Sequence, residues 1–257
     1  MSNLLSRSVK GSVVLITGAG GGMGAATAAV FAAEGAHVAV TDRDTQAAVA
    51  VAETILADGG SAHPWSLDVA DPQQIKAVVG EIAARFGGLD CVINNAGISG
   101  FAAIDDDGYE AVWDRSVAVL LTSHHRVIRA ALPHLRKSAA PRIVNIASTE
   151  ALGATARDSA YAAAKAGVTG LTRALAVELG REGITVNCIC PGPILTGMTD
   201  AIPDEARQTY AKRRTALGRY GAPDEVAHMT LSLCLPAASY LTGVVIPVDG
   251  GLMARNA

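Results

Sequence analysis

The sequence predicts an α/β fold built on a single doubly wound parallel sheet with helices on both faces. Short apolar runs alternate with helical segments along the whole 257-residue chain, the order of elements that is typical of a parallel α/β sheet. The runs are continuously apolar, as expected for strands that are buried on both faces. A glycine-rich turn also joins the first run to the first helical segment.

The individual elements follow from these runs in order. The β-branched run 13–17 leads through the glycine turn into 25–33, whose alanine-rich composition favours a helix. The runs 36–41 and 142–147 have the same apolar character as the first. Strands are therefore expected near 13–17, 36–41, 62–67, 90–94, 142–147, 184–190 and 244–248. Helices are expected over 22–34, 45–58, 72–86, 109–136, 158–180 and 223–235.

The composition suits one domain that spans residues 1–257 and buries a full core. Half of the residues are hydrophobic but only 4% are aromatic, so Ala, Val, Ile and Leu are expected to build most of that core. The segment 192–222 is rich in proline, glycine, threonine and charged residues. It predicts a loop with a short helix at about 203–212.

Charge and cysteine usage exclude several classes of partner. A formal charge of −3 leaves no basic face for nucleic acid, and the cluster 212–214 is interpreted as a solvated helix end. No apolar run approaches the ~20 residues that span a bilayer, and the opening residues 1–8 do not resemble a secretory signal. We therefore expect a cytoplasmic protein without a membrane partner. The four cysteines lack metal-ligand spacing and are expected to be buried, so no metal site is predicted.

The glycine turn predicts a dinucleotide site. Residues 18–24 read Gly-Ala-Gly-Gly-Gly-Met-Gly between a strand and a helix. Backbone without Cβ atoms can approach a pyrophosphate closely, and the helix N-terminus offers unpaired N–H groups. Asp42 ends the second apolar run, eighteen residues beyond Gly24, where a carboxylate accepts hydrogen bonds from ribose hydroxyls. Strand, turn, helix and carboxylate together are typical of a Rossmann fold.

Three side chains predict proton chemistry at a carbonyl oxygen. Tyr161 and Lys165 are four residues apart and so share one helix face. Ser148, thirteen residues before Tyr161, falls at the end of the run 142–147. An unperturbed tyrosine titrates near ~10, and a lysine one turn away is expected to lower that pKa.

These residues together resemble the short-chain dehydrogenase/reductase family. The resemblance extends from about Val9 to Gly251 and keeps the order and spacing of the family's motifs. More loosely, the chain resembles the bacterial 3-oxoacyl-carrier-protein reductase and secondary-alcohol dehydrogenase branches. The motifs are Thr17-Gly18-x-x-x-Gly22-x-Gly24, Asp68-Val69, Asn94-Asn95-Ala96-Gly97, Ser148, Tyr161-x-x-x-Lys165, Pro191-Gly192 and Asp249-Gly250-Gly251.

The resemblance implies a role for each motif. Tyr161 would be the acid/base, Lys165 would tune it and hold the nicotinamide ribose, and Ser148 would hold the substrate oxygen. The segment 192–222 would cover the substrate, and a homotetramer would be the assembly. The expected cofactor contacts are Gly18, Gly21, Gly22, Met23 and Gly24 at the pyrophosphate, Asp42 at the adenosine ribose, Asp68 and Val69 at the adenine, Asn95 beside that ribose, and Ile194 and Thr196 at the nicotinamide side.

NAD is the expected cofactor and NADP the less favoured one. The 2′-phosphate of NADP would add about −2 charge against the Asp42 carboxylate. Arg43 directly follows Asp42, and some NADP-dependent relatives use an arginine there. In those relatives the preceding residue is usually not acidic.

One position departs from the family pattern. Relatives carry an asparagine in the helix before the serine strand, where its side chain helps to hold a water next to the lysine. Leu120 stands at that position here and has no polar atom. Ser116 and His124 lie one turn to either side and are candidates for the same task.

The sequence thus predicts an oxidoreductase that transfers a hydride between NAD(H) and a secondary alcohol or its ketone, with a small molecule as substrate. Two alternatives remain open. One is an NADPH-dependent reductase of 3-oxoacyl or related ketones. The other is a nucleotide-binding regulatory protein with weakened catalysis, which the Leu120 departure permits.

Overall fold

The computed structural model of the chain describes residues 5–256 and contains one sheet of seven parallel strands. The strand order is β3-β2-β1-β4-β5-β6-β7, so the direction in which strands are added reverses between β1 and β4. Ligands of such sheets bind beyond the carboxyl ends of the strands at this reversal. The strands are β1 (Val13–Thr17), β2 (His37–Asp42), β3 (Ser61–Ser66), β4 (Cys91–Asn94), β5 (Arg142–Ile146), β6 (Thr185–Pro191) and β7 (Val245–Val248).

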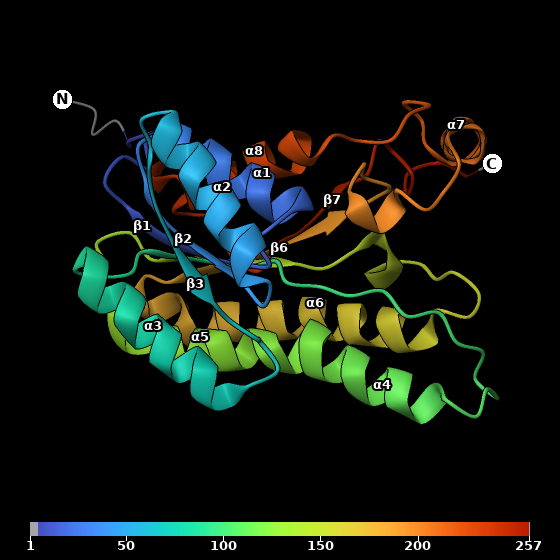
Figure 1. Cartoon of the computed structure of the whole chain (residues 1–257), viewed down its shortest axis with the longest axis horizontal. Coiled ribbons are helices and arrows are strands. Elements are labelled where there is room, and N and C mark those ends of the chain that lie inside the picture. The colour runs from blue at the N-terminus through green and yellow to red at the C-terminus, as the bar shows by residue number, and fades with distance from the viewer. Residues whose placement is uncertain (1–4, 257) are drawn as a thin grey trace.

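Helices cover both faces of the sheet (Figure 1). One layer contains α1 (Gly22–Ala33), α2 (Thr45–Ala57) and α8 (Pro223–Cys234). The opposite layer contains α3 (Pro72–Phe86), α4 (Tyr109–Val117), α5 (Ser123–Leu135) and α6 (Ser159–Leu179). The predicted doubly wound fold is confirmed, and each predicted strand lies within one residue of its observed bounds.

Alternate residues of the central strand serve the two layers. Val14 and Ile16 of β1 pack in the core cluster under α1, α2 and α8, whereas Val13 and Leu15 pack under α3, α5 and α6. All four side chains are at most 4% exposed. Burial on both faces explains why the strands are apolar without alternation.

The predicted helix 109–136 is wrong in one respect, because a π-helical turn, η1 (Ala118–Thr122), separates α4 from α5. The backbone N–H of Ser123 donates to the carbonyl of Ala118, five residues earlier. The Ser123 hydroxyl donates to the Val119 carbonyl at 2.6 Å and so provides that oxygen with a partner. Such turns insert one extra residue into a helix and recur at functional sites.

The remaining short elements lie at turns and in the segment 192–222. This segment contains η4 (Gly197–Thr199) and α7 (Asp204–Arg214), which confirms the short helix expected at 203–212. The other 3-10 turns are η2 (Thr149–Ala151), η3 (Gly180–Glu182) and η5 (Pro236–Ala238). Among residues 5–256, no helix has the length and apolar character needed to cross a bilayer.

The glycine turn brings α1 very close to the end of β1. Gly18 and Gly22 have φ angles of +64° and +53°, in the region that side chains rarely adopt. A Cβ added to Gly24 would lie 2.1 Å from the Gly18 carbonyl oxygen and 2.6 Å from Nδ2 of Asn95. Gly24 is therefore required by packing between helix and strand. Gly21 has open space around it and extended φ and ψ angles.

We expect Gly24→Ala to destabilise the fold by about 1–3 kcal/mol or more, because overpacking displaces α1 from β1. This sign opposes the ordinary preference of helices for alanine over glycine, which is worth about 1 kcal/mol. Gly21→Ala is the matched control and should change stability by less than about 0.5 kcal/mol. Urea unfolding at one protein concentration measures both variants, and equal midpoints would contradict this packing.

Candidate active site

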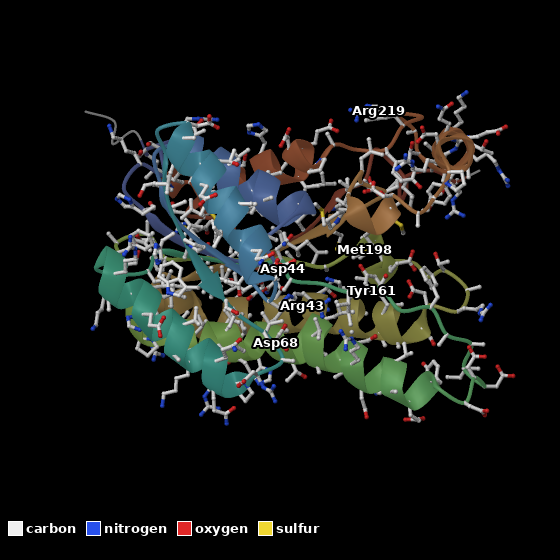
Figure 2. All side chains as sticks on the ribbon, viewed as in Figure 1. Arg43, Asp44, Asp68, Tyr161, Met198 and Arg219 are labelled. Atoms are coloured by element: carbon white, nitrogen blue, oxygen red, sulfur yellow. The ribbon has the colours of Figure 1, made fainter. Side chains whose placement is uncertain are left out.

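A cleft runs along the carboxyl ends of β1, β2, β4 and β5. It consists of two adjoining hollows of about 180 and 350 Å³, which both contact Gly18, Asp42, Gly97 and Ile98. Figure 2 shows Arg43 and Asp68 toward one end of this region and Tyr161 and Met198 toward the other. The sheet topology therefore brings the glycine turn and the predicted catalytic residues to the same edge.

The Asp42 carboxylate is held rigidly at the end of β2. One oxygen accepts a hydrogen bond from the Gly20 N–H at 3.0 Å, and the other accepts from the Asp44 N–H at 2.9 Å. Asp42 contacts both hollows and so faces the cleft where they meet. Each carboxylate oxygen retains a lone pair for a further donor such as a ribose hydroxyl.

The smaller hollow contains the two residues that the family resemblance assigns to the adenine. Asp68 and Val69 line it, and the Ala70 N–H donates to the Asp68 carboxylate at 2.9 Å. Arg43 also lines it, together with Arg115 of α4 and Val119 of η1. The sequence prediction missed Arg115 and Val119, because neither belongs to a motif near the turn and only the fold brings them there.

The larger hollow has the features of a pyrophosphate site. Gly18, Gly21, Gly22 and Met23 line it from one side and Thr196 from the other. Helix α1 begins at this hollow without a side-chain cap and without an acidic residue in its first turn. Its first N–H groups and positive partial charge are therefore free for an anion. The open space beside Gly21 gives phosphate oxygens room to approach, so the residues present fit a dinucleotide.

Asn95 fixes the geometry of this turn. Its side-chain amide donates to the carbonyls of Thr17 and Gly18 at 2.9 and 3.0 Å. In return, the Thr17 hydroxyl accepts from the backbone N–H groups of Asn95 and Ala96, both at 3.0 Å. The predicted buttressing position of Asn95 is thus observed, and the residue also contacts the larger hollow.

Ser148, Tyr161 and Lys165 come from two neighbouring elements. Ser148 follows β5 directly, and its Oγ accepts a hydrogen bond from the Glu150 N–H at 3.1 Å. Tyr161 and Lys165 lie in the first two turns of α6, and both contact the larger hollow. The Lys165 ammonium lies 5.7 Å from the Tyr161 ring centroid and donates to the Ile146 carbonyl at 2.8 Å.

Burial dominates the electrostatics of the pair. Burial raises the pKa of Tyr161 to about 12, although interaction with the Ser148 hydroxyl opposes the rise. Burial likewise lowers the pKa of Lys165 to about 8, because the residue is only 3% exposed. The expectation that Lys165 brings the Tyr161 pKa below its ordinary value is therefore wrong for this arrangement. Removal of the phenol from water is the largest cause of the rise, and the carboxylates of Asp158 and Glu150 add to it.

Three of the predicted site residues do not line the cleft. Gly24 packs against Gly18, and Ser148 follows β5, where its hydroxyl interacts with the Tyr161 side chain. Ile194 is 6% exposed and its side chain belongs to the core cluster under α8. Its predicted contact with the nicotinamide would have to come from its backbone.

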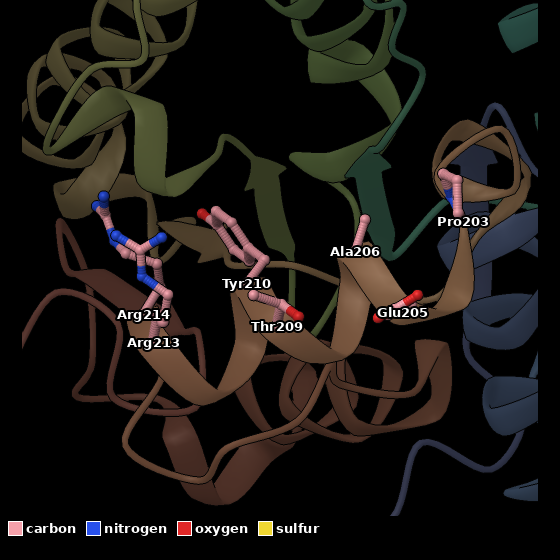
Figure 3. A pocket seen from close by; sticks show the side chains of 7 residues that line it. All are labelled: Pro203, Glu205, Ala206, Thr209, Tyr210, Arg213 and Arg214. Carbon is pink, nitrogen blue, oxygen red and sulfur yellow. The ribbon is translucent and has the colours of Figure 1, made fainter.

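A third hollow, of about 600 Å³, lies outside this cleft, along α7 (Figure 3). It contains none of the predicted site residues. Pro203 and side chains of α7 line it, including Tyr210, Arg213 and Arg214. No glycine turn, strand end or buried titratable pair accompanies it, so its size alone gives it no catalytic meaning. Among residues 5–256, no group of three His, Cys, Asp or Glu side chains is arranged to hold a metal ion.

Comparison with known proteins agrees with this geometry. A family model described as enoyl-(acyl carrier protein) reductase matches residues 18–253. A 3-oxoacyl-[acyl-carrier-protein] reductase of Thermotoga maritima is 39% identical over 95% of this chain and 99% of its own length. A meso-2,3-butanediol dehydrogenase of Serratia marcescens is 38% identical over 95% of each chain. The chain belongs to the short-chain dehydrogenase/reductase family.

Solved structures of short-chain dehydrogenase/reductase proteins superimpose closely on this one. A short-chain type dehydrogenase/reductase from Mycobacterium marinum gives a TM-score of 0.91 with 32% identity and covers 97% of this chain and 98% of its own. As a short-chain dehydrogenase/reductase, the protein is an oxidoreductase that uses a nicotinamide cofactor and a small-molecule substrate.

Proposed function

We propose that this short-chain dehydrogenase/reductase transfers a hydride between NAD(H) and a secondary alcohol or its ketone. The observation that carries the proposal is the position of Tyr161 and Lys165 in the same hollow as the glycine turn. A bound nicotinamide would supply or accept the hydride. The protein's own task is then to move one proton and to stabilise one oxygen.

Tyr161 is the proposed acid/base. A phenol whose pKa is about 12 is neutral at pH 7 and ready to donate its proton to a ketone oxygen. In the direction of alcohol oxidation the phenol must lose that proton first. The Lys165 ammonium, 5.7 Å from the ring centroid, is a cation that would favour the phenolate. By the family likeness, Lys165 also holds the nicotinamide ribose.

Ser148 is the proposed holder of the substrate oxygen. Its Oγ accepts from the Glu150 N–H, which orients the side chain and leaves the hydroxyl hydrogen to donate elsewhere. A donor aimed at an oxygen that gains negative charge lowers the barrier for reduction. Exchange of one such donor typically changes kcat by a factor of about 10²–10³.

The cofactor contacts proposed from the family likeness follow the lining of the cleft. Asp42 would bind the adenosine ribose, Asp68 and Val69 the adenine, and Asn95 would support that ribose. The pyrophosphate would lie against Gly18, Gly21, Gly22 and Met23, with Gly24 providing the close packing. Thr196 and the backbone of Ile194 would meet the nicotinamide side. The chain would act as one dinucleotide-binding domain, with 192–222 covering the substrate.

Apolar side chains of this segment favour a substrate with apolar surface beside its carbinol carbon. Met198 is 55% exposed and lines the larger hollow, and Ile202 of the same segment is also exposed.

An NADPH-dependent reductase of 3-oxoacyl groups is the second candidate. The relative from Thermotoga maritima supports it by name, and Arg43 and Arg115 put two cations beside the adenine pocket. The Asp42 carboxylate, which is fixed by two backbone donors, favours NAD instead. A homotetramer is also proposed, because Val177 and Tyr240 expose apolar surface on α6 and after η5. A cytoplasmic location stays a prediction.

We expect Tyr161→Phe to lower kcat by about 10²–10⁴-fold for secondary alcohols or ketones, because only the transferable proton is lost. The Kd for NADH, measured by fluorescence, should change by less than about threefold. Tyr109→Phe is the matched control, since it removes a buried phenolic hydroxyl that is bonded to Ser159 at 2.8 Å and lies outside the cleft lining.

Retention of more than a tenth of wild-type kcat by Tyr161→Phe would contradict the assignment of this tyrosine. A wild-type protein that binds NADH but turns over no alcohol, ketone or 3-oxoacyl thioester would instead favour the regulatory alternative.

We expect the protein to prefer NAD, and Asp42→Asn to reduce the ratio of kcat/KM for NAD to that for NADP by at least about tenfold. Hydrogen bonds to a charged acceptor are worth about 1.5–3 kcal/mol, and the repulsion of a 2′-phosphate disappears with the charge. Asp44→Asn carries the same charge change two residues away, and asparagine can still cap α2. This control should leave the ratio within about threefold. A wild-type preference for NADP would mean that Arg43 and Arg115 decide the cofactor.

A further inference from the structure

The buried His124 has no assigned role in the proposed reaction, yet it lies beside its machinery. His124 is 2% exposed, and within residues 5–256 neither ring nitrogen makes a hydrogen bond of normal geometry, although the Asn94 backbone lies beside the ring. A buried polar group without a partner is costly, so both nitrogens require an explanation. Burial, and then the charge of Lys165, lower the pKa of His124 to about 3. The imidazole is therefore neutral, with one N–H donor and one acceptor nitrogen.

Lys165 has more hydrogen-bond donors than its one observed acceptor. The residue is 3% exposed, its ammonium carries three N–H donors, and the Ile146 carbonyl accepts one of them at 2.8 Å. The Asn94 side chain adds a second deficit, because its amide donates to Asn145 while its own Oδ1 has no partner in the part of the chain that is described. Asn94 pairs with Asn145 across β4 and β5, one residue before the Ile146 carbonyl that holds Lys165, and α5 packs against β4. The His124 ring, the Asn94 amide oxygen and the remaining ammonium donors are therefore brought to the same part of the core.

The π-helical turn explains how His124 reaches this region. Leu120, inside the turn, is fully buried and packs near Gly97 without a polar atom to offer. His124 follows one turn later at the start of α5, beside the backbone of Asn94 and the charge of Lys165. Leu120 is therefore apolar at a position where the family pattern has a polar side chain, and the polar His124 lies one turn later in the buried part of α5.

We propose that His124 is a positioning residue for Lys165. The Lys165 ammonium donates to one buried water, and that water donates to the acceptor nitrogen of the neutral His124 imidazole. The water also donates to Oδ1 of Asn94, while the imidazole N–H donates to the Asn94 backbone carbonyl. A buried water typically makes about three hydrogen bonds, and these partners supply that number. The network keeps Lys165 charged and aimed at Tyr161.

The sign of the effect on pH dependence follows from the charges around Lys165. The thiols of Cys188 and Cys190 on β6 face the ammonium and raise its pKa, whereas burial lowers it. Asp158 and Glu150 act on Tyr161 from the other side and raise the pKa of the phenol. If the imidazole acceptor is lost, Lys165 gives up its proton at lower pH. Tyr161 then loses the neighbouring cation, and its phenolate forms only at higher pH.

The test is His124→Leu, which keeps apolar volume and removes both nitrogens. For alcohol oxidation, kcat at pH 7 should fall at least about tenfold, and the rising limb of the pH profile should move up by about one unit or more. The Kd for NADH should stay within about threefold. His125→Leu is the matched control, because His125 is the exposed neighbour on the same helix and should change none of these values.

A rescue experiment separates this role from a loss of packing. Leu120→Asn should restore most of the activity and the pH profile in the His124→Leu background, because it returns a polar group one turn earlier. In the wild-type background Leu120→Asn should change kcat by less than about tenfold, the value of one neutral hydrogen bond. If His124→Leu is unfolded by circular dichroism, His124→Met takes its place.

Because the inference rests on the proposed function, one readout does not depend on turnover. NMR titration of labelled lysine in the cofactor-free protein, with Lys165 assigned from Lys165→Met, should show a lower Lys165 pKa in His124→Leu than in the wild type. An unchanged pKa, or an unchanged pH profile, would overturn the role of His124. A wild type that turns over no substrate would overturn the proposed function, while the NMR result would still decide the inference.

Discussion

The junction between Thr17 and Asn95 is the constraint on which the rest of the site depends. Four hydrogen bonds of 2.9–3.0 Å join the end of β1 to the end of β4, where the strand order reverses. Parallel strands that diverge at this point would otherwise leave backbone groups without partners. The junction fixes the carbonyl of Gly18, and the close contact with Gly24 then sets where α1 begins. The uncapped N-terminal end of that helix is thus positioned by the Asn95 amide, at the end of the neighbouring strand.

The second constraint is a buried cation. Lys165 lies among apolar side chains and thiols, and its position on α6 is fixed by the Ile146 carbonyl at the end of β5. A buried ammonium is stable only if its donors find acceptors, so the elements around it must supply them. This requirement connects the catalytic helix to the π turn before α5, and it gives a physical reason for a polar side chain inside that enclosed helix.

The sequence predicted the fold well because the signals were local. Continuous apolar runs such as 13–17 and 142–146 have no other stable place than a two-sided sheet. The π turn at 118–122 could not be predicted, since no glycine or proline marks it and its cause is a tertiary environment. Helix periodicity alone continues smoothly through it.

The site was most predictable where a motif lies at a strand end. The glycine turn, Asp42 and Asp68 lie on the cleft because their spacing fixes them to strand ends, and Tyr161 reaches it from the first turn of α6. Arg115 reaches the smaller hollow only through the packing of α4, a helix distant in the sequence. The raised pKa of Tyr161 depends on how much water the fold removes, and no spacing reveals that quantity.

Binding of a dinucleotide between Asp42 and Tyr161 can be checked directly in a crystal structure of the complex with NADH. The adenosine ribose hydroxyls should donate to the Asp42 carboxylate, and the pyrophosphate should lie against Gly21 and Gly22. The nicotinamide ring should lie beside Tyr161, close to Thr196. A dinucleotide bound in the opposite direction, or in the hollow along α7, would contradict this assignment of the cleft.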